Sequence, residues 1–176
     1  MKLLEIRDFA QVDGRRLMDV YAESNEESID YFYPDTTDRA AALVKIKEDF
    51  LTYIRDGFLQ KEQNRYMVLE REVEWVSALR LYELGAGEYY IEALETCPDC
   101  RRQGFGSQLL GAVLERLGAE GPFRVRDCVS KKNTASLRTH EKCGFTVADS
   151  VGHDLLDGSV DERCYSMEYR YPPEAL

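Results

Sequence analysis

Residues 101–106 are the part of this sequence best suited to hold an anion. They read Arg-Arg-Gln-Gly-Phe-Gly, and they lie between an apolar run at residues 89–94 and a helical pattern of leucines and valines from Leu109 to Leu117. A strand, a turn and a helix are therefore expected to meet at Gly104 and Gly106. The first N–H groups of a helix lack intrahelical partners and attract phosphate, and glycine lets a ligand approach the backbone closely. The stretch predicts a pyrophosphate-binding loop.

Two common phosphate loops do not fit this stretch. The dinucleotide pattern G-x-G-x-x-G would need a third glycine where Leu109 stands, and the sequence contains no G-x-x-x-x-G-K-[ST]. The stretch resembles instead the acyl-CoA loop of the GCN5-related N-acetyltransferases, [QR]-x-x-G-x-[GA], which Arg101 to Gly106 matches at every position. Residues 132–145, KNTASLRTHEKCGF, resemble that family's downstream segment, including its Glu-Lys-x-Gly-Phe ending. The resemblance covers residues 67–170.

The resemblance implies an α/β fold, with a mixed, mostly antiparallel sheet flanked by about four helices in one domain over residues 1–176. It implies direct transfer of an acetyl group from acetyl-CoA to a primary amine of a small molecule or peptide. A CoA-binding sensor or interaction module on the same fold is the alternative. The residues that it assigns to the acyl donor are Leu94, Glu95, Thr96, Arg101, Arg102, Gln103, Gly104, Phe105, Gly106, Ser107 and Asn133, the last also as a helix N-cap.

The position at which the resembled family often carries a tyrosine acid is His140 in this chain. An imidazolium could protonate the departing CoA thiolate, since the ordinary pKa of histidine is near 6.5. Alternatively, His140 is a helix residue packed beneath the donor with both nitrogens satisfied. The sequence leaves both interpretations open.

A base for the attacking amine is expected on the strand before the loop. Glu92 and Glu95 are three residues apart, so on a regular strand they face opposite ways, and at most one faces the acceptor unless a bulge intervenes. Glu92 is the predicted base because it lies within the buried run, which would raise its pKa. A solvated or ion-paired Glu92, Asp127 or Cys128 as base, and a water relay are the alternatives.

The hydrophobic patterns predict where the remaining elements lie. Strands are expected at residues 3–9, 65–70, 74–84, 88–96, 123–129, 145–155 and 163–171. Helices are expected at residues 14–24 and 38–55, from the loop at residues 101–106 to residue 118, and from 133 to 143. The short connections between residues 65 and 96 predict antiparallel hairpins. Residues 25–35 are expected to lead into the loop before the second helix, where Tyr31, Phe32 and Tyr33 either shape the acceptor pocket or simply pack.

The composition limits the kinds of partner. The net charge of −10 and pI near 4.8 disfavour nucleic acid and anionic membranes and are compatible with a cationic acceptor. Without an apolar leader or spanning segment, the chain is expected to be cytoplasmic. The five cysteines are expected to be reduced, and Cys97 and Cys100 to be bystanders, with a redox pair or zinc site as the alternative. We expect no metal. The acceptor, the acyl length and any homodimer stay open.

Overall fold

The sheet at the centre of the molecule has seven strands in the order β1-β2-β3-β4-β5-β9-β6. The computed structural model describes residues 1–172. Its strands are β1 (Lys2–Ile6), β2 (Arg65–Arg71), β3 (Glu74–Gly85), β4 (Glu88–Thr96), β5 (Phe123–Ser130), β6 (Thr146–Asp149) and β9 (Cys164–Tyr171). Neighbouring strands are antiparallel except β4 and β5, which are parallel. The predicted mixed, mostly antiparallel sheet is confirmed.

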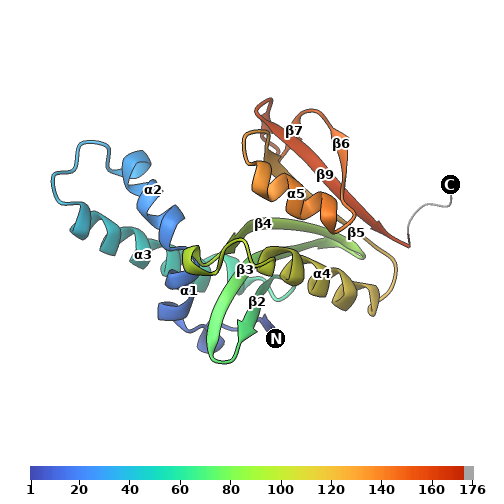
Figure 1. The fold of residues 1–176 in the computed structure, drawn as a ribbon, viewed down its shortest axis with the longest axis horizontal. Helices are drawn as coiled ribbons and strands as arrows, with labels where there is room; N and C mark the ends of the chain where they lie inside the picture. The colour runs from blue at the N-terminus through green and yellow to red at the C-terminus, as the bar shows by residue number, and fades with distance from the viewer. Residues whose placement is uncertain (173–176) are drawn as a thin grey trace.

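Helices cover both faces of this sheet (Figure 1). They are α1 (Gly14–Val20), α2 (Ala22–Phe32), α3 (Arg39–Asp56), α4 (Phe105–Gly118) and α5 (Thr134–Lys142). The apolar stripe of α4 packs with Met67, Leu79 and Ile91 on one face. On the other face, α1 and α3 bury Leu17 and Ile54. Within residues 1–172, no helix has both the length and the apolar character needed to cross a membrane.

The segment that was expected to lead into a loop is helical. α1 ends at Val20, and α2 then runs to Phe32, where Tyr33 caps it before Pro34. The described chain therefore has five α-helices instead of about four. Only Asn25 and Ile29 of α2 are buried. The helix was missed because two buried positions leave too sparse an apolar stripe for a period to be recognised.

The predicted strand over residues 145–155 is two strands. β6 ends at Asp149, whose carboxylate accepts the Val151 N–H at 3.0 Å, and this local turn interrupts the ladder. The next piece, β7 (Gly152–His153), pairs with β8 (Val160–Asp161) in a separate two-stranded sheet. Between them Gly158 adopts a φ of 78° in the connecting turn.

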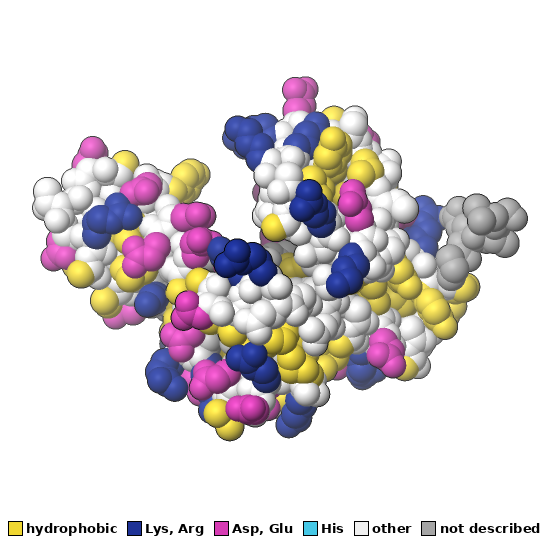
Figure 2. All heavy atoms as spheres, viewed as in Figure 1, with side chains coloured by type: hydrophobic (Ala, Val, Ile, Leu, Met, Phe, Trp, Pro, Cys, Tyr) yellow, Lys and Arg dark blue, Asp and Glu magenta, His cyan; other side chains and the backbone are white. Residues whose placement is uncertain are grey.

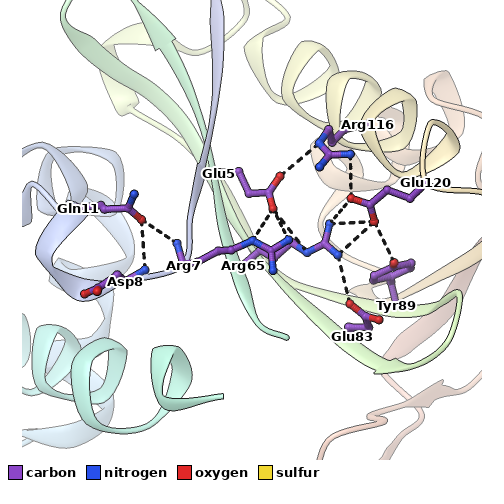
Figure 3. A network of polar contacts seen from close by, with 9 residues as sticks. All are labelled: Glu5, Arg7, Asp8, Gln11, Arg65, Glu83, Tyr89, Arg116 and Glu120. Carbon is purple, nitrogen blue, oxygen red and sulfur yellow. Dashed lines mark hydrogen bonds and ion pairs between the residues drawn. The ribbon is translucent and has the colours of Figure 1, made fainter. Parts of the chain in front are cut away.

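A buried arginine fixes the far end of α4 to the sheet (Figure 3). Arg65 of β2 is 4% exposed, and its Nη1 donates to Glu120, just after α4, at 3.0 Å. Its Nη2 donates to Glu83 of β3 at 3.2 Å, and its Nε lies 3.8 Å from Glu5 of β1. Because several carboxylates surround this one guanidinium, its burial is compensated. The anchor holds α4 so that its first turn points into the site described next.

Candidate functional site

β4 and β5 separate halfway along their length. They pair only between residues 88–91 and 124–127, although β4 continues to Thr96 and β5 to Ser130. A cavity of about 710 Å³ occupies the gap and reaches α2, the start of α4 and α5. Figure 2 shows the molecule hollowed between the α2–α3 pair and α5. This volume is in the range of small-molecule sites, about 300–1,000 Å³.

A β-bulge in β4 shapes the wall of this cavity. Glu92 pairs with Arg80 and Glu95 with Ala78, so two residues of β4 lie opposite the single residue between those partners. Ala93 in the bulge has a φ of 51°, and its carbonyl accepts the Tyr21 hydroxyl of α1's C-cap at 2.7 Å. Since the two partners on β3 are two residues apart, Glu92 and Glu95 face the same side of the sheet. Opposite faces were expected only for a regular strand, and the bulge removes that condition.

The predicted phosphate loop lies at one end of the cavity. Gly104 has a φ of 80° and is the N-cap of α4, without a side-chain cap. The leading N–H groups of α4 therefore have no helical acceptor and lie beside the cavity, which Gly104, Phe105, Gly106 and Ser107 line. A Cβ on Gly106 would come within 3.4 Å of Thr96 Oγ1, so glycine permits the close contact between α4 and β4.

The charged residues of the loop have different surroundings. Arg101 and Arg102 both line the cavity. Arg101 forms an ion pair with Glu23 of α2, which also lines the cavity, and the hydrogen bond and charge of Arg101 lower the pKa of Glu23. Gln103 does not line the cavity, and its side-chain oxygen accepts from Arg71 at 3.4 Å.

Asn133 contributes from the start of α5. Its carbonyl oxygen accepts the Ser136 N–H at 3.0 Å, as an N-cap does, and the side chain also lines the cavity. The backbone positions predicted for acetyl binding, Leu94, Glu95 and Thr96, line the cavity as well. Most of the predicted donor-binding residues are thus brought together around one space.

His140 is 0% exposed and does not line the cavity. Its Nδ1 lies 2.8 Å from the Ser136 carbonyl oxygen and its Nε2 lies 2.8 Å from Asp127 Oδ2. Burial alone would lower the pKa of His140, but the hydrogen bonds to Asp127 and Ser136 and the Asp127 charge raise it overall. Asp127 itself lines the cavity, and so does Ser136, whose Oγ lies 3.4 Å from His140 Nδ1, so His140 meets the site through these two residues.

The end of the cavity nearest α2 is acidic. Glu23, Glu27 and Glu95 line it, together with Ser24. Burial raises the pKa of Glu95 to about 7, with Glu23 and Glu27 adding to the effect while Ser24 and Arg101 oppose it. Glu95 therefore changes charge near neutral pH, as a general base does. The spacing of Glu23 and Glu27, four residues apart on a helix, was the one sequence signal for this wall.

Glu92, the predicted base, is held elsewhere. Its Oε2 accepts the Tyr82 hydroxyl at 2.6 Å and lies 3.2 Å from Arg80 Nη2, and it does not line the cavity. Tyr82 in turn contacts the Tyr53 hydroxyl of α3 at 3.0 Å. The polar chain from Glu92 thus runs towards α3, away from the donor loop.

All five cysteines are free thiols. Cys128 of β5 lines the cavity, and burial and the neighbouring Cys164 raise its pKa to about 12, so it is a weak nucleophile. Burial likewise raises the pKa of Cys97. Among residues 1–172, no three His, Cys, Asp or Glu side chains form a metal-binding group.

Sequence comparison identifies the class of protein. The profile of the acetyltransferase (GNAT) family matches residues 17–145. The match spans more than half of the chain, which therefore belongs to this family. No curated protein sequence matches the chain.

Solved structures share the fold over nearly the whole chain. The PaiA N-acetyltransferase of Thermoplasma acidophilum, in complex with coenzyme A, is 17% identical with a TM-score of 0.63, covering 97% of this chain and 100% of its own. An aminoglycoside 6'-acetyltransferase type Ii is 15% identical with a TM-score of 0.65 and coverages of 99% and 100%. The spermidine N-acetyltransferase of Vibrio cholerae, in complex with CoA and spermine, is 16% identical with a TM-score of 0.60 and coverages of 96% and 95%. At these identities the likeness establishes the fold.

Proposed function

We propose that this acetyltransferase passes the acetyl group of acetyl-CoA directly to a primary amine of a small molecule or peptide. The observation that carries the proposal is a single cavity with a phosphate cradle at one end and a carboxylate of pKa about 7 at the other. Several structural neighbours are N-acetyltransferases of amines, among them the spermidine enzyme. Acetyl-CoA supplies the activated acyl group as a thioester.

The donor end fits an anionic pyrophosphate. The first-turn N–H groups after Gly104 and the guanidinium of Arg102 face the same space, so dipole and charge act on a phosphate together. Asn133 and Ser107 add polar side chains along the route from the loop to the strands. Glycine at 104 and 106 keeps this route open.

The backbone of β4 offers donors to the thioester carbonyl oxygen. The Cys97 N–H bonds the Val76 carbonyl of β3 at 3.0 Å. Because N–H groups alternate sides along a regular strand, that of Thr96 faces the gap that β5 leaves open. The bulge between Glu92 and Glu95 sets the direction of the Leu94 N–H. The Thr96 N–H would stabilise negative charge developing on that oxygen.

Glu95 is the proposed base. It lies on the bulged part of β4, beside Leu94 and on the acidic side of the cavity, and near neutral pH a large fraction is ionised. The carboxylate would take a proton from the acceptor ammonium, and Glu23 and Glu27 would attract that cation. Glu92, with Arg80 and Tyr82 as its partners, is proposed to support the bulge.

The leaving thiolate needs no strong acid in this site. A thiol has a pKa near 8.5, far below that of an alcohol, so the thiolate leaves readily. A proton from His140 would have to pass through Asp127 or Ser136, the two partners of the histidine that line the cavity. The buried histidine is also the observation that favours the alternative, a CoA-binding sensor with little turnover.

The experiment that tests the proposal combines binding and turnover. Calorimetry with acetyl-CoA and CoA should give binding that Gly104→Glu abolishes. A thiol-release assay with spermidine, an aminoglycoside and a peptide with a free N-terminus should give turnover on at least one amine. Binding without turnover on any amine would support the sensor, and no binding at all would refute the loop assignment.

A further inference from the structure

A second cavity lies on a different face of α2 from the first. It has a volume of about 390 Å³ and lies between α2 and α3. Its walls are the rings of Phe32, Tyr33, Phe50 and Tyr53 together with Ile46. The donor cavity uses other positions of α2, so the helix separates the two spaces. A volume above about 300 Å³ with apolar walls is typical of a small-molecule site.

A buried amide in this second cavity lacks a partner. Asn25 is 5% exposed and lines the cavity, and its Nδ2 lies 3.6 Å from Met18 Sδ, a weak acceptor. Its side-chain carbonyl oxygen accepts no hydrogen bond from residues 1–172, and it is not among the fully enclosed unpaired atoms of that range, so it is open to the cavity. The amide therefore offers an acceptor to an occupant of the cavity. Exchanging the amide oxygen and nitrogen would leave one end of the group unpaired all the same.

Ser28 and Asp49 offer further acceptors around the cavity, which the Tyr33 and Tyr53 side chains also line. Ser28 Oγ donates to the Ser24 carbonyl at 2.7 Å, which leaves its lone pairs free. Asp49 pairs with Lys45 through one carboxylate oxygen at 2.6 Å. Arg80, a buried cation near this cavity, lies over the Phe50 and Tyr53 rings and is paired with Glu92. A ligand that brings N–H donors can therefore pair with the acceptors of Asn25, Ser28 and Asp49.

The charge of the surrounding helices indicates whether the N–H group of the ligand is neutral or cationic. Residues 22–56 contain nine Asp and Glu against four Lys and Arg, a net charge of −5. Such a field attracts a cation, and the faces of aromatic rings stabilise one further. We propose that this cavity binds a small amphiphilic amine, with its apolar part between the Phe50 and Tyr53 rings and its ammonium donating to Asn25 and Ser28.

The inference goes beyond the proposed transfer reaction and does not depend on it. It would hold for a chain that binds CoA without turnover, since no residue of the donor cavity takes part. Both cavities are lined by residues of α2. An occupant of the second cavity would therefore contact the helix that carries Glu23 and Glu27. The bound amine is thus a second ligand, distinct from the acceptor.

The test is calorimetry with 2-phenylethylamine at pH 7, compared with 2-phenylethanol and 3-phenylpropionate. The amine should bind, and the alcohol and the anion should bind at least about tenfold more weakly, the equivalent of one charge-assisted hydrogen bond. Asn25→Leu, which keeps the size and removes the orphaned group, should weaken amine binding about tenfold. Ser28→Phe should fill the cavity and abolish binding. Val44→Ala, at an exposed position of α3 outside the cavity, is the matched control.

Two further measurements distinguish amine binding in this cavity from binding in the first cavity and from dimerisation. Glu95→Gln should leave this binding unchanged; if that variant weakens it while Asn25→Leu does not, the amine occupies only the first cavity and the proposal fails. Sedimentation of the unliganded protein tests whether a second copy fills the space with its exposed Tyr31 or Phe32. A dimer that Ser28→Phe dissociates would overturn the proposal, as would the absence of amine binding at millimolar concentration.

Discussion

His140 Nε2 lies 2.8 Å from Asp127 Oδ2, and this contact joins α5 to β5 directly behind the donor cavity. Both ring nitrogens face acceptors, the Asp127 carboxylate and the Ser136 carbonyl oxygen, so the imidazole is expected to carry both protons. The pair is therefore a buried ion pair at the point where β4 and β5 separate. Its first role is to fix the position of α5 and its N-cap Asn133.

The stability of the fold should depend on pH through this pair. The folded-state pKa of His140 is raised above its unfolded value near 6.5. The stabilisation is thus fully present below about pH 6.5 and is lost as pH rises through the raised pKa. Urea unfolding at pH 6 and pH 9 should show lower stability at pH 9. His140→Phe should cost about 3 kcal/mol at pH 6, because it leaves Asp127 unpaired, and should reduce the difference between the two pH values. An equal difference in the variant would contradict this.

Tyr21 should position the bulge. Its hydroxyl holds the Ala93 carbonyl at 2.7 Å, which sets the direction of the neighbouring N–H groups. Tyr21→Phe removes that hydrogen bond at a cost of about 1 kcal/mol of stability. We expect turnover to fall about fivefold to tenfold while CoA affinity stays within about twofold, because the phosphate loop is untouched. Tyr31→Phe, at a position 80% exposed, is the control. A loss of CoA affinity as large as the loss of turnover would mean that the hydroxyl supports the whole site.

The phosphate loop predicts that substitutions at Gly104 and Gly111 of the α4 region affect CoA affinity differently. Gly104→Glu places a carboxylate beside the first turn of α4, at a φ of 80° that a side chain disfavours. CoA affinity measured by calorimetry should fall by at least about a hundredfold, since charge and strain act together. At Gly111, by contrast, an added Cβ meets nothing within 4 Å. Gly111→Glu should bind CoA as the unchanged chain does, and similar losses in the two variants would point to general damage to α4.

The ion pair of Glu23 with Arg101 should compete with the donor. The pair is exposed, so solvent screens it and it is easily broken. Glu23→Gln would free Arg101 for the pyrophosphate, so CoA should bind about twofold to fivefold more tightly at low salt and less so at high salt. Asp30→Gln, which breaks an exposed pair with Arg39 away from the cavity, is the control. Unchanged affinity for CoA would indicate that Arg101 does not reach the phosphates.

Local patterns in the sequence were enough to predict the loop. Gly104, the leucine stripe of α4 and the N-cap Asn133 each depend on a few neighbouring residues, and the structure has all three. The resemblance to a family implied a mixed sheet, and the structure places its parallel contact between β4 and β5. The open gap between β4 and β5 could not be predicted, because it depends on where these two strands, distant in sequence, stop pairing.

The side chains of the acceptor end were harder to predict. The bulge that turns Glu95 towards Glu92's side is visible only in the register of β3 against β4, and no residue type marks it. α2 has almost no apolar face, so its carboxylates could not be assigned to a wall of the cavity. The burial of His140 depends on Asp127, thirteen residues away on another element.

The last prediction concerns the pH dependence of the reaction. Glu95 must be ionised to accept a proton, and burial raises its pKa to about 7. The rate of thiol release at subsaturating amine should therefore rise with pH and reach half its plateau near pH 7, as far as Glu95 controls it. Glu95→Gln should lower the plateau about a hundredfold, in line with the usual contribution of a general base, and remove this step. Glu27→Gln should move the half-point to lower pH, because Glu27 helps to raise the Glu95 pKa. Glu92→Gln is the comparison: if it removes the pH step and Glu95→Gln does not, Glu92 is the base after all.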